Sequence, residues 1–318
     1  MQLLIRWREK QKITRRLGLF VRPPKFFHSM NTLKQEMKEF WGKGWGKRGQ
    51  ADKSVQSRER FLQELGAIRM LLEMEEGEQV REMQKIGLKG KAVLEIGCGA
   101  GSSSILFALD GAQVTASDLT DEAVAITKAK FDLLGLAGNA VQADAENLPF
   151  PDNSFDVVFS SGVLHHTPNT QKTIDEIRRV LKPGGNAVVM LYAKWSFQYL
   201  VSLLLMRGII FGGIFRHGRN WLGHATELAW NTKEDRLNPM TKVYSGRQMR
   251  QLFKEFEIIG LRKHSFHWPD LFPGVYHIWK RRRVHLGDAD VMSLSSFERV
   301  IGRFAGFALV IHARKLFK

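Results

Sequence analysis

The sequence predicts an α/β fold built on a mostly parallel sheet. Between residues 92 and 192, short apolar runs alternate with segments of helical periodicity, and right-handed crossovers join such elements into a parallel sheet. Of the 318 residues, 44% are hydrophobic and 25% are charged, so the chain can bury a core and does not belong to the disordered class. It has a single cysteine and no Cys/His cluster with zinc spacing, so we expect no internal disulfide and no metal site.

Each element is expected where the period of its apolar residues changes. The expected strands are residues 92–96, 112–117, 139–143, 155–160, 186–192, 257–265 and 307–314. The expected helices are residues 57–86, 102–109, 121–134, 170–181 and 245–253, with another near 293–304. Residues 1–50 are basic and aromatic, and we expect a loosely ordered arm with a short helix near residues 32–40.

The charge of the chain is unevenly distributed. The formal net charge is +16. The balance is +11 over residues 1–60, −7 over residues 61–193 and +12 over residues 194–318. Basic flanks around an acidic middle suggest contact with an anionic partner, although a solvated basic surface explains the same pattern. Residues 199–215 are apolar but contain Arg207 and three glycines, and they are shorter than a membrane span; we expect a buried or interfacial helix there.

A glycine-rich loop lies between the first expected strand and the helix after it. In VLEIGCGAGSSS (93–104), Gly97, Gly99 and Gly101 allow a tight turn and a close approach of the backbone to a ligand. A dinucleotide fingerprint has the spacing G-x-G-x-x-G. Here the third glycine comes one residue early and Ser102 takes its place, so the loop is less suited to a pyrophosphate.

Two aspartates follow the next two strands. Asp118 lies 17 residues after Gly101, where a carboxylate can accept hydrogen bonds from both hydroxyls of a ribose. Asp144, in QADAENLPF, can accept one from an adenine amino group. These positions fall at the carboxyl ends of strands, where open parallel sheets bind their ligands. The pattern therefore predicts a nucleoside-binding site.

Four motifs together resemble one enzyme family. VLEIGCGAG, ASDLT, ADAENLPFPDNSFDVVFSSGVLHHTPN and LKPGG lie in this order within residues 88–192, about a third of the chain. They resemble the class I S-adenosylmethionine-dependent methyltransferases of the type 11 group, which includes the ubiquinone and menaquinone C-methyltransferases. The resemblance implies a Rossmann-like sheet of seven strands in the order 3-2-1-4-5-7-6, with the last strand antiparallel. It also implies S-adenosylmethionine as cofactor and methyl transfer as the reaction.

The resemblance carries roles over to individual positions. Residues on the first strand and its loop would hold the amino-acid end of the cofactor, those after the second strand the ribose, and those after the third the adenine. Residues ending the fourth strand would form the floor beneath the methionine part. The implied cofactor-binding residues are Glu95, Gly97, Gly99, Gly101, Asp118, Leu119, Asp144, Ala145, Ser160, Ser161 and Gly162.

His165 and His166 are the candidate catalytic residues, because they follow the fourth strand and an imidazole titrates near neutral pH. The alternative is that one of them caps the next helix or packs on the cofactor. Asp156 at a strand start and Cys98 within the loop are interpreted as structural residues.

We divide the chain into a basic arm (1–56), the cofactor-binding core (57–193), a lid over the acceptor (194–244) and a C-terminal completion of the sheet (245–318). The last part contains an inserted basic aromatic segment, and the helix 57–86 is expected near the cofactor edge. Aromatic residues are abundant outside the sheet, which favours an apolar or lipid-like small-molecule acceptor over a simple core-filling role.

The basic flanks leave other partners open. They suit a peripheral contact with an anionic membrane, and a nucleic acid or a peptide as acceptor is the alternative. We expect a cytoplasmic protein, peripheral to a membrane if the first option holds. The sequence does not identify the acceptor, the atom that is methylated or the oligomeric state.

Overall fold

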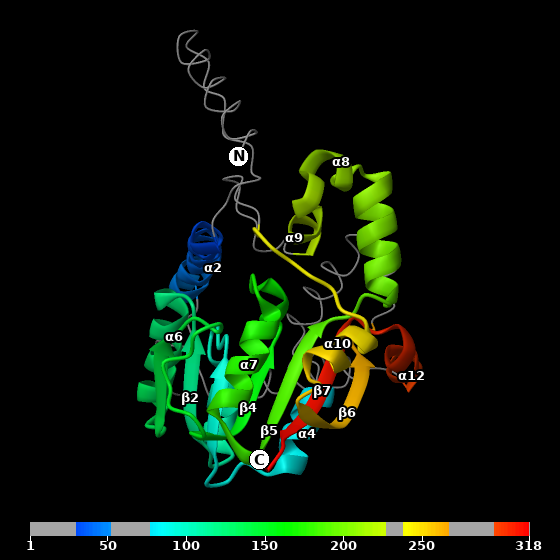
Figure 1. Cartoon of the computed structure of the whole chain (residues 1–318). Helices are drawn as coiled ribbons and strands as arrows, with labels where there is room; N and C mark the ends of the chain where they lie inside the picture. Colours follow the sequence, from blue (N-terminus) through cyan, green and yellow to red (C-terminus); the bar gives the residue numbers. More distant parts are fainter. Residues whose placement is uncertain (1–29, 52–76, 227–237, 267–295, 318) are drawn as a thin grey trace, which may run out of the picture.

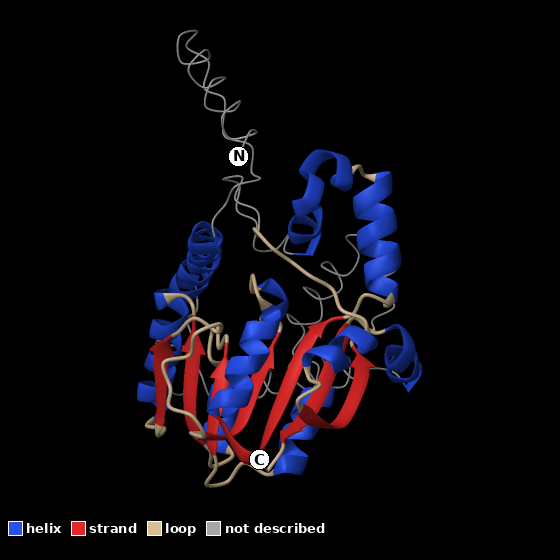
Figure 2. Ribbon diagram, in the orientation of Figure 1, coloured by secondary structure: helices blue, strands red, loops and turns tan. Residues whose placement is uncertain are grey.

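The computed structural model describes residues 30–51, 77–226, 238–266 and 296–317. Its centre is a seven-stranded sheet with the order β3-β2-β1-β4-β5-β7-β6 (Figures 1 and 2). β7 is antiparallel to both of its neighbours, and the other described pairs are parallel. This is the predicted fold class. The strands are β1 (Ala92–Ile96), β2 (Gln113–Asp118), β3 (Gly138–Gln142), β4 (Phe155–Ser161), β5 (Leu181–Tyr192), β6 (Phe256–His264) and β7 (Ala308–Lys315).

Helices cover both faces of the sheet and extend beyond the carboxyl ends of its parallel strands (Figure 1). Those that precede or join the strands are α2 (Met30–Ala51), α4 (Gly77–Ile86), α5 (Ser102–Leu109), α6 (Asp121–Leu134), the 3-10 turn η3 (Leu164–His166) and α7 (Thr170–Val180). After β5 come the π-helix η4 (Gln198–Ile210), α8 (Gly213–His217), η5 (Gly218–Asn220), α9 (Trp221–Thr226), α10 (Gly246–Leu252) and α12 (Ser296–Ala305).

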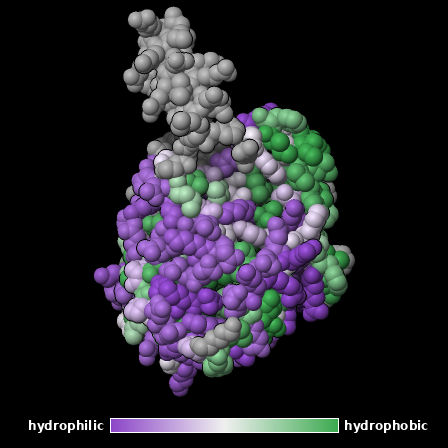
Figure 3. Space-filling model, in the orientation of Figure 1, coloured by the Kyte–Doolittle hydropathy of each residue, from purple (hydrophilic) through white to green (hydrophobic). Residues whose placement is uncertain are grey.

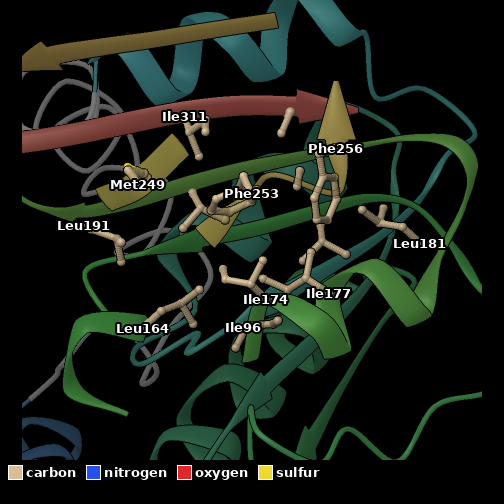
Figure 4. Close-up of a cluster of buried hydrophobic side chains, with 14 of the residues drawn as sticks. Ile96, Leu164, Ile174, Ile177, Leu181, Leu191, Met249, Phe253, Phe256 and Ile311 are labelled. Carbon is tan, nitrogen blue, oxygen red and sulfur yellow. The ribbon is translucent and has the colours of Figure 1, made fainter. Parts of the chain in front are cut away.

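The alternation of side chains along β1 separates two hydrophobic cores. Leu94 and Ile96 face the core beneath α7 and α10, whereas Val93 faces the one beneath α4 and α5. Figure 4 shows the first core, where Ile174 and Ile177 of α7 meet side chains from the strands and from α10. Each such fully buried aliphatic side chain contributes about 1.5–3 kcal/mol.

The sequence of α7 explains why this helix lies where it does. Its buried residues are Thr170, Thr173, Ile174, Ile177 and Val180, a spacing of three and four that forms one helical face. The side chain of Asn169 caps its first turn by accepting from the Lys172 amide, 3.1 Å away. The loop between β4 and α7 is thereby held in one conformation above the sheet.

Two expectations about the first helices need correction. The short helix near residues 32–40 is a 22-residue helix, α2, that runs to Ala51. The expected helix 57–86 is described only over α4, since residues 52–76 lie outside the described part. α4 packs against β5, β6 and β7 and contributes no residue to the cavity described below. The cofactor edge of the sheet is instead next to α2, which contacts α6.

The segment after β5 forms a helical hairpin. Residues 199–215 are helical, as expected, apart from a break at residues 211–212 between η4 and α8. Among the described residues, no helix is both long enough and apolar enough to cross a lipid bilayer. The basic aromatic segment inserted before β7 lies mostly in residues 267–295, outside the described part.

Candidate functional site

A cavity of about 640 Å³ opens at the carboxyl ends of β1 to β5. Its floor comes from the segments that follow these strands, and its remaining wall comes from α2. Figure 1 shows α2 standing above this edge of the sheet, beside α6. The cavity therefore occupies the position where an open α/β sheet binds its ligand.

The glycine loop after β1 is shaped by contacts within the protein. Gly97 has φ of 78°, and a Cβ added there would lie 2.2 Å from a methyl group of Val163; only glycine fits this turn. The Gly97 amide donates to the Ser117 carbonyl over 2.7 Å, so the loop is joined to β2. Gly97 and Gly99 line the cavity as expected. Gly101 does not line it; this residue is the N-cap of α5 instead.

Asp118 connects the end of β2 to this loop. Its carboxylate accepts from the Gly99 amide over 3.1 Å, and from the amide and hydroxyl of Thr120 over 3.0 and 2.8 Å. The residue is 8% exposed and lines the cavity. Burial raises the pKa of Asp118, although these hydrogen bonds act in the opposite direction. A carboxylate oxygen has two lone pairs. Both bonds from Thr120 go to Oδ1, so Oδ2, which accepts from Gly99, is the oxygen that keeps acceptor capacity.

Glu95 is a second buried carboxylate on the cavity wall. It lies near the end of β1, is 4% exposed and accepts from the hydroxyl of Ser104 in α5. With Asp118 at the end of β2 and Asp144 after β3, it gives three carboxylates at the ends of three adjacent strands. This acidic rim suits a ligand that carries positive charge and hydroxyl groups.

Asp144 forms an ion pair that the sequence analysis did not anticipate. The Lys34 ammonium of α2 lies 2.5 Å from Asp144 and 2.8 Å from Glu146, whose side chain is only 1% exposed. Partial burial lowers the pKa of Lys34, but hydrogen bonds to both carboxylates outweigh it and raise this pKa. α2 is thus held to the adenine side of the predicted site.

α2 contributes Lys34, Met37, Trp41 and Trp45 to the cavity. Their spacing of three, four and four residues places them on one helical face. This spacing is the pattern in the sequence that could have identified them as site residues. The glycines of WGKGWGKRG obscured it because they favour a loop interpretation. One of them lies close to α6, since a Cβ on Gly42 would lie 2.7 Å from the carboxylate of Glu122.

The cavity contains two of the three residues predicted to form a floor after β4. Ser161 and Gly162 line it, and so do Leu119 and Ala145. Ser160 is fully buried and absent from the cavity wall; its hydroxyl donates to the Ile96 carbonyl over 2.9 Å. Neighbouring residues in a strand point to opposite faces, which is why Ser160 joins β4 to β1 instead.

The two candidate histidines have different positions. His166 lines the cavity, with its ring 5.2 Å from that of Trp41. His165 does not line it: its ring lies 3.7 Å from that of Tyr192, and its nitrogens have no hydrogen-bond partner among the described residues. Burial lowers the pKa of His165 well below its usual value and lowers that of His166 to about 4. Both imidazoles are therefore neutral at pH 7, and His166 alone can contact a ligand.

A loop after the hairpin orients His166. Its Nδ1 lies 2.9 Å from the Met240 carbonyl and 3.1 Å from the Asn238 side-chain amide. Asn238 is fully buried and also donates to the Thr241 hydroxyl over 3.1 Å. No motif in the sequence singles out these residues, since they lie 72 to 75 positions from the histidine that they contact.

Asp156 and Cys98 have the structural roles expected of them. Asp156 accepts from the Ala92 amide and from Lys182, each over 2.9 Å, and so joins the starts of three strands. Cys98 is buried, and its sulfur lies 3.4 Å from the Thr127 hydroxyl. Burial, with the charges of Asp118 and Glu95, raises the pKa of the Cys98 thiol well above its usual value. A thiol that stays protonated is not a nucleophile.

Comparison with known proteins agrees with this geometry. Residues 94–189 match the family model described as "Methyltransferase domain". Over 107 residues, the chain is 40% identical to the phthiotriol/phenolphthiotriol dimycocerosates methyltransferase of Mycobacterium tuberculosis, covering 33% of this chain and 39% of that protein. Over 117 residues, it is 36% identical to the ubiquinone/menaquinone biosynthesis C-methyltransferase UbiE of Psychromonas ingrahamii, covering 35% and 47%. The match thus spans less than half the length of these relatives.

Solved structures share the fold at lower identity. The crystal structure of the [4+2]-cyclase SpnF gives a TM-score of 0.50 at 19% identity, covering 80% of this chain and 81% of that one. A chain in the complex between the Haloferax volcanii Trm112 methyltransferase activator and its methyltransferase gives 0.51 at 16%, covering 89% and 98%. The glycine loop, the acidic rim and the family match coincide in one segment, and residues 94–189 are accordingly a class I, S-adenosylmethionine-dependent methyltransferase domain of the type 11 group.

Proposed function

We propose that this protein transfers a methyl group from S-adenosylmethionine to an apolar, lipid-like small molecule. The names of the relatives support this class of acceptor, because they refer to dimycocerosate lipids and to quinones. The fold alone would not be sufficient, since a protein described as a cyclase shares it. The observation that carries the proposal is the lining of the cavity, which combines the acidic rim with apolar and aromatic side chains.

The acidic rim fits the cofactor. S-adenosylmethionine carries a cationic sulfur, an ammonium group and a ribose diol. Glu95 and the glycine loop would receive the amino-acid end, Asp118 the ribose hydroxyls, and Asp144 with Ala145 the adenine. Gly162 adds a place of close approach, because a Cβ there would meet only Met190, at 3.8 Å.

The apolar and aromatic part of the cavity lining fits an apolar acceptor. Met37 and Trp41 of α2 lie on the cavity wall together with Val163 and Tyr192. Apolar and aromatic walls with few polar groups are typical of sites for small apolar ligands. An apolar wall of this kind would favour a reaction that needs alignment and desolvation.

When bound, S-adenosylmethionine supplies an activated methyl group for an electron-rich atom of the acceptor. The part left to the protein is to orient the acceptor and to receive a proton where the acceptor loses one. His166 is neutral and can accept a hydrogen bond or a proton, but a pKa of about 4 makes it a weak base. We therefore assign His166 mainly to positioning, and His165 to packing behind it.

The test begins with cofactor affinity. Asp118→Ala removes a buried carboxylate from the ribose position, and hydrogen bonds to charged groups contribute about 1.5–3 kcal/mol. Isothermal titration with S-adenosylmethionine should show a loss of affinity of about 10- to 150-fold. Asp132→Ala, which removes an exposed carboxylate from α6 away from the cavity, should bind normally. Equal affinities in the two variants, both folded by circular dichroism, would refute the assignment of the site.

The second measurement concerns the acceptor. The full chain is incubated with S-adenosylmethionine labelled in its methyl group and with a cell extract, which is then separated into lipid, nucleic-acid and protein fractions. We expect the label in the lipid fraction and its loss with Asp118→Ala. Label found only in RNA or in protein would contradict the proposed acceptor class.

A further inference from the structure

The helical hairpin after β5 carries a cluster of exposed apolar side chains at its outer end. Five residues where η4 meets α8, here named the apolar tip, are each 44–82% exposed: Leu205, Ile209, Ile210, Phe211 and Phe215. Figure 1 shows this hairpin projecting beyond the carboxyl ends of the strands. In Figure 3, hydrophobic colouring is concentrated on this part of the visible face. A contiguous apolar surface of this kind marks an interaction site.

The apolar tip is not a poorly packed part of the core. The inner side of the hairpin has its own small cluster, formed by Leu203 of η4 with Leu222 and Ala225 of α9. Arg207 strengthens this packing, because its guanidinium donates to the Ala225 carbonyl. The hairpin is therefore held together from within, and its outer residues are left over as a separate surface.

The charge around the apolar tip indicates what covers it. Residues 194–226 contain four basic residues and no aspartate or glutamate. Arg216 is exposed and directly follows Phe215, the most exposed residue of the tip. A second copy of the chain would bring these like charges together without an acidic counterpart, which disfavours self-association through this face. Apolar side chains beside an exposed cation match the acyl boundary and phosphates of an anionic bilayer.

A second pair of exposed aromatic residues lies at the base of the hairpin. Trp195 is 57% exposed and Phe304 of α12 is 74% exposed. The Lys263 ammonium donates to the carbonyls of both residues, over 2.6 and 2.9 Å, so the two lie next to each other. Tryptophan is enriched at the interface between lipid and water, where its ring lies at the level of the headgroups.

We propose that the hairpin docks this protein on an anionic lipid bilayer, with the apolar tip inserted at the level of the headgroups. The basic residues around the tip then contact lipid phosphates. This is an interfacial contact and not a membrane span. The proposal requires no methyl transfer, and it holds or falls independently of the acceptor. It does explain how a lipid-like acceptor would come close to the cavity, since the hairpin and the cavity lie beyond the same ends of the strands.

The experiment is co-sedimentation of the full chain with vesicles. One set contains phosphatidylcholine alone, and the other contains phosphatidylcholine mixed with phosphatidylglycerol. We expect binding to the anionic set to be at least tenfold stronger and to weaken as salt increases. The double variant Ile210→Ser/Phe215→Ser should lose at least tenfold in binding to the anionic vesicles, and Arg216→Gln a smaller part.

The matched control is Leu109→Ser, which removes an exposed leucine, 45% accessible, from the end of α5. It should bind vesicles like the unmodified chain. Titration with S-adenosylmethionine on every variant shows that each is folded, and it separates a failure of docking from a failure of the proposed function. Equal binding of the double variant and the control to anionic vesicles would overturn the proposal. So would a change of the double variant from dimer to monomer in sedimentation velocity with vesicle binding unaltered.

Discussion

Adding one methyl group at Gly162 tests the cavity directly. Gly162 and Gly135 have nearly the same backbone, with φ of 73° and 62°, and neither has an atom closer than 3.8 Å to an added Cβ. Alanine at either position therefore costs about 1–2 kcal/mol through the left-handed conformation alone. Only Gly162 lines the cavity; Gly135 ends α6. The two variants should lose equal stability but differ in cofactor affinity.

The difference in affinity can be estimated. An extra methyl group in a closely filled space costs about 1–3 kcal/mol, which corresponds to a loss of about 5- to 150-fold. Guanidinium denaturation followed by tryptophan fluorescence measures the stability of both variants, and isothermal titration with S-adenosylmethionine measures the affinity. If Gly162→Ala binds the cofactor as tightly as Gly135→Ala, the cofactor does not reach the end of β4 and this part of the site is misplaced.

Two further predictions concern α2 and His166. Lys34→Met leaves the buried Glu146 without its ion pair and should lower the free energy of unfolding by about 1–3 kcal/mol. Lys38→Met breaks an exposed pair and should change the free energy of unfolding by less than about 1 kcal/mol. Equal effects of the two variants in denaturant titrations would count against the role of Lys34. The pKa of His166 is lowered by burial from 6.5 to about 4, so as the pH falls below 6.5 the unfolded chain takes up the proton first. The contribution of His166 to the free energy of unfolding is fully present above pH 6.5. It decreases by about 3 kcal/mol as the pH falls to 4. His166→Gln should make the pH dependence of the melting temperature shallower, and an unchanged profile would contradict the burial of a neutral imidazole.

The cofactor half of the site could be predicted from the sequence because its residues are close together along the chain. Glu95, the glycine loop and Asp118 all lie within 24 consecutive residues, and each is placed by the strand or turn next to it. Where single positions were wrong, the reason is local geometry. Ser160 faces away from the cavity because side chains alternate along β4, and Gly101 is the N-cap residue directly before α5.

The remaining wall of the cavity could not be predicted in this way. Its wall combines α2 with the turn after β4 and the end of β5, segments that are distant in sequence. The glycines of α2 indicated a loop, although the segment that contains them is helical. The same holds for His166, whose ring is oriented by residues more than 70 positions away.

The strand order with its antiparallel last strand came from the resemblance to the family. By itself, the sequence determined the order of the elements, the parallel sheet, and the position of Asp118 and Asp144 directly at or after the ends of strands. These follow from the apolar period and from turn residues, which act over a few neighbouring positions. The tertiary structure decided that α2 closes the cavity, that one histidine of two reaches it, and that the apolar residues of the hairpin remain outside the core. Those outcomes depend on which surfaces pack against each other, and packing is a property of the whole folded chain.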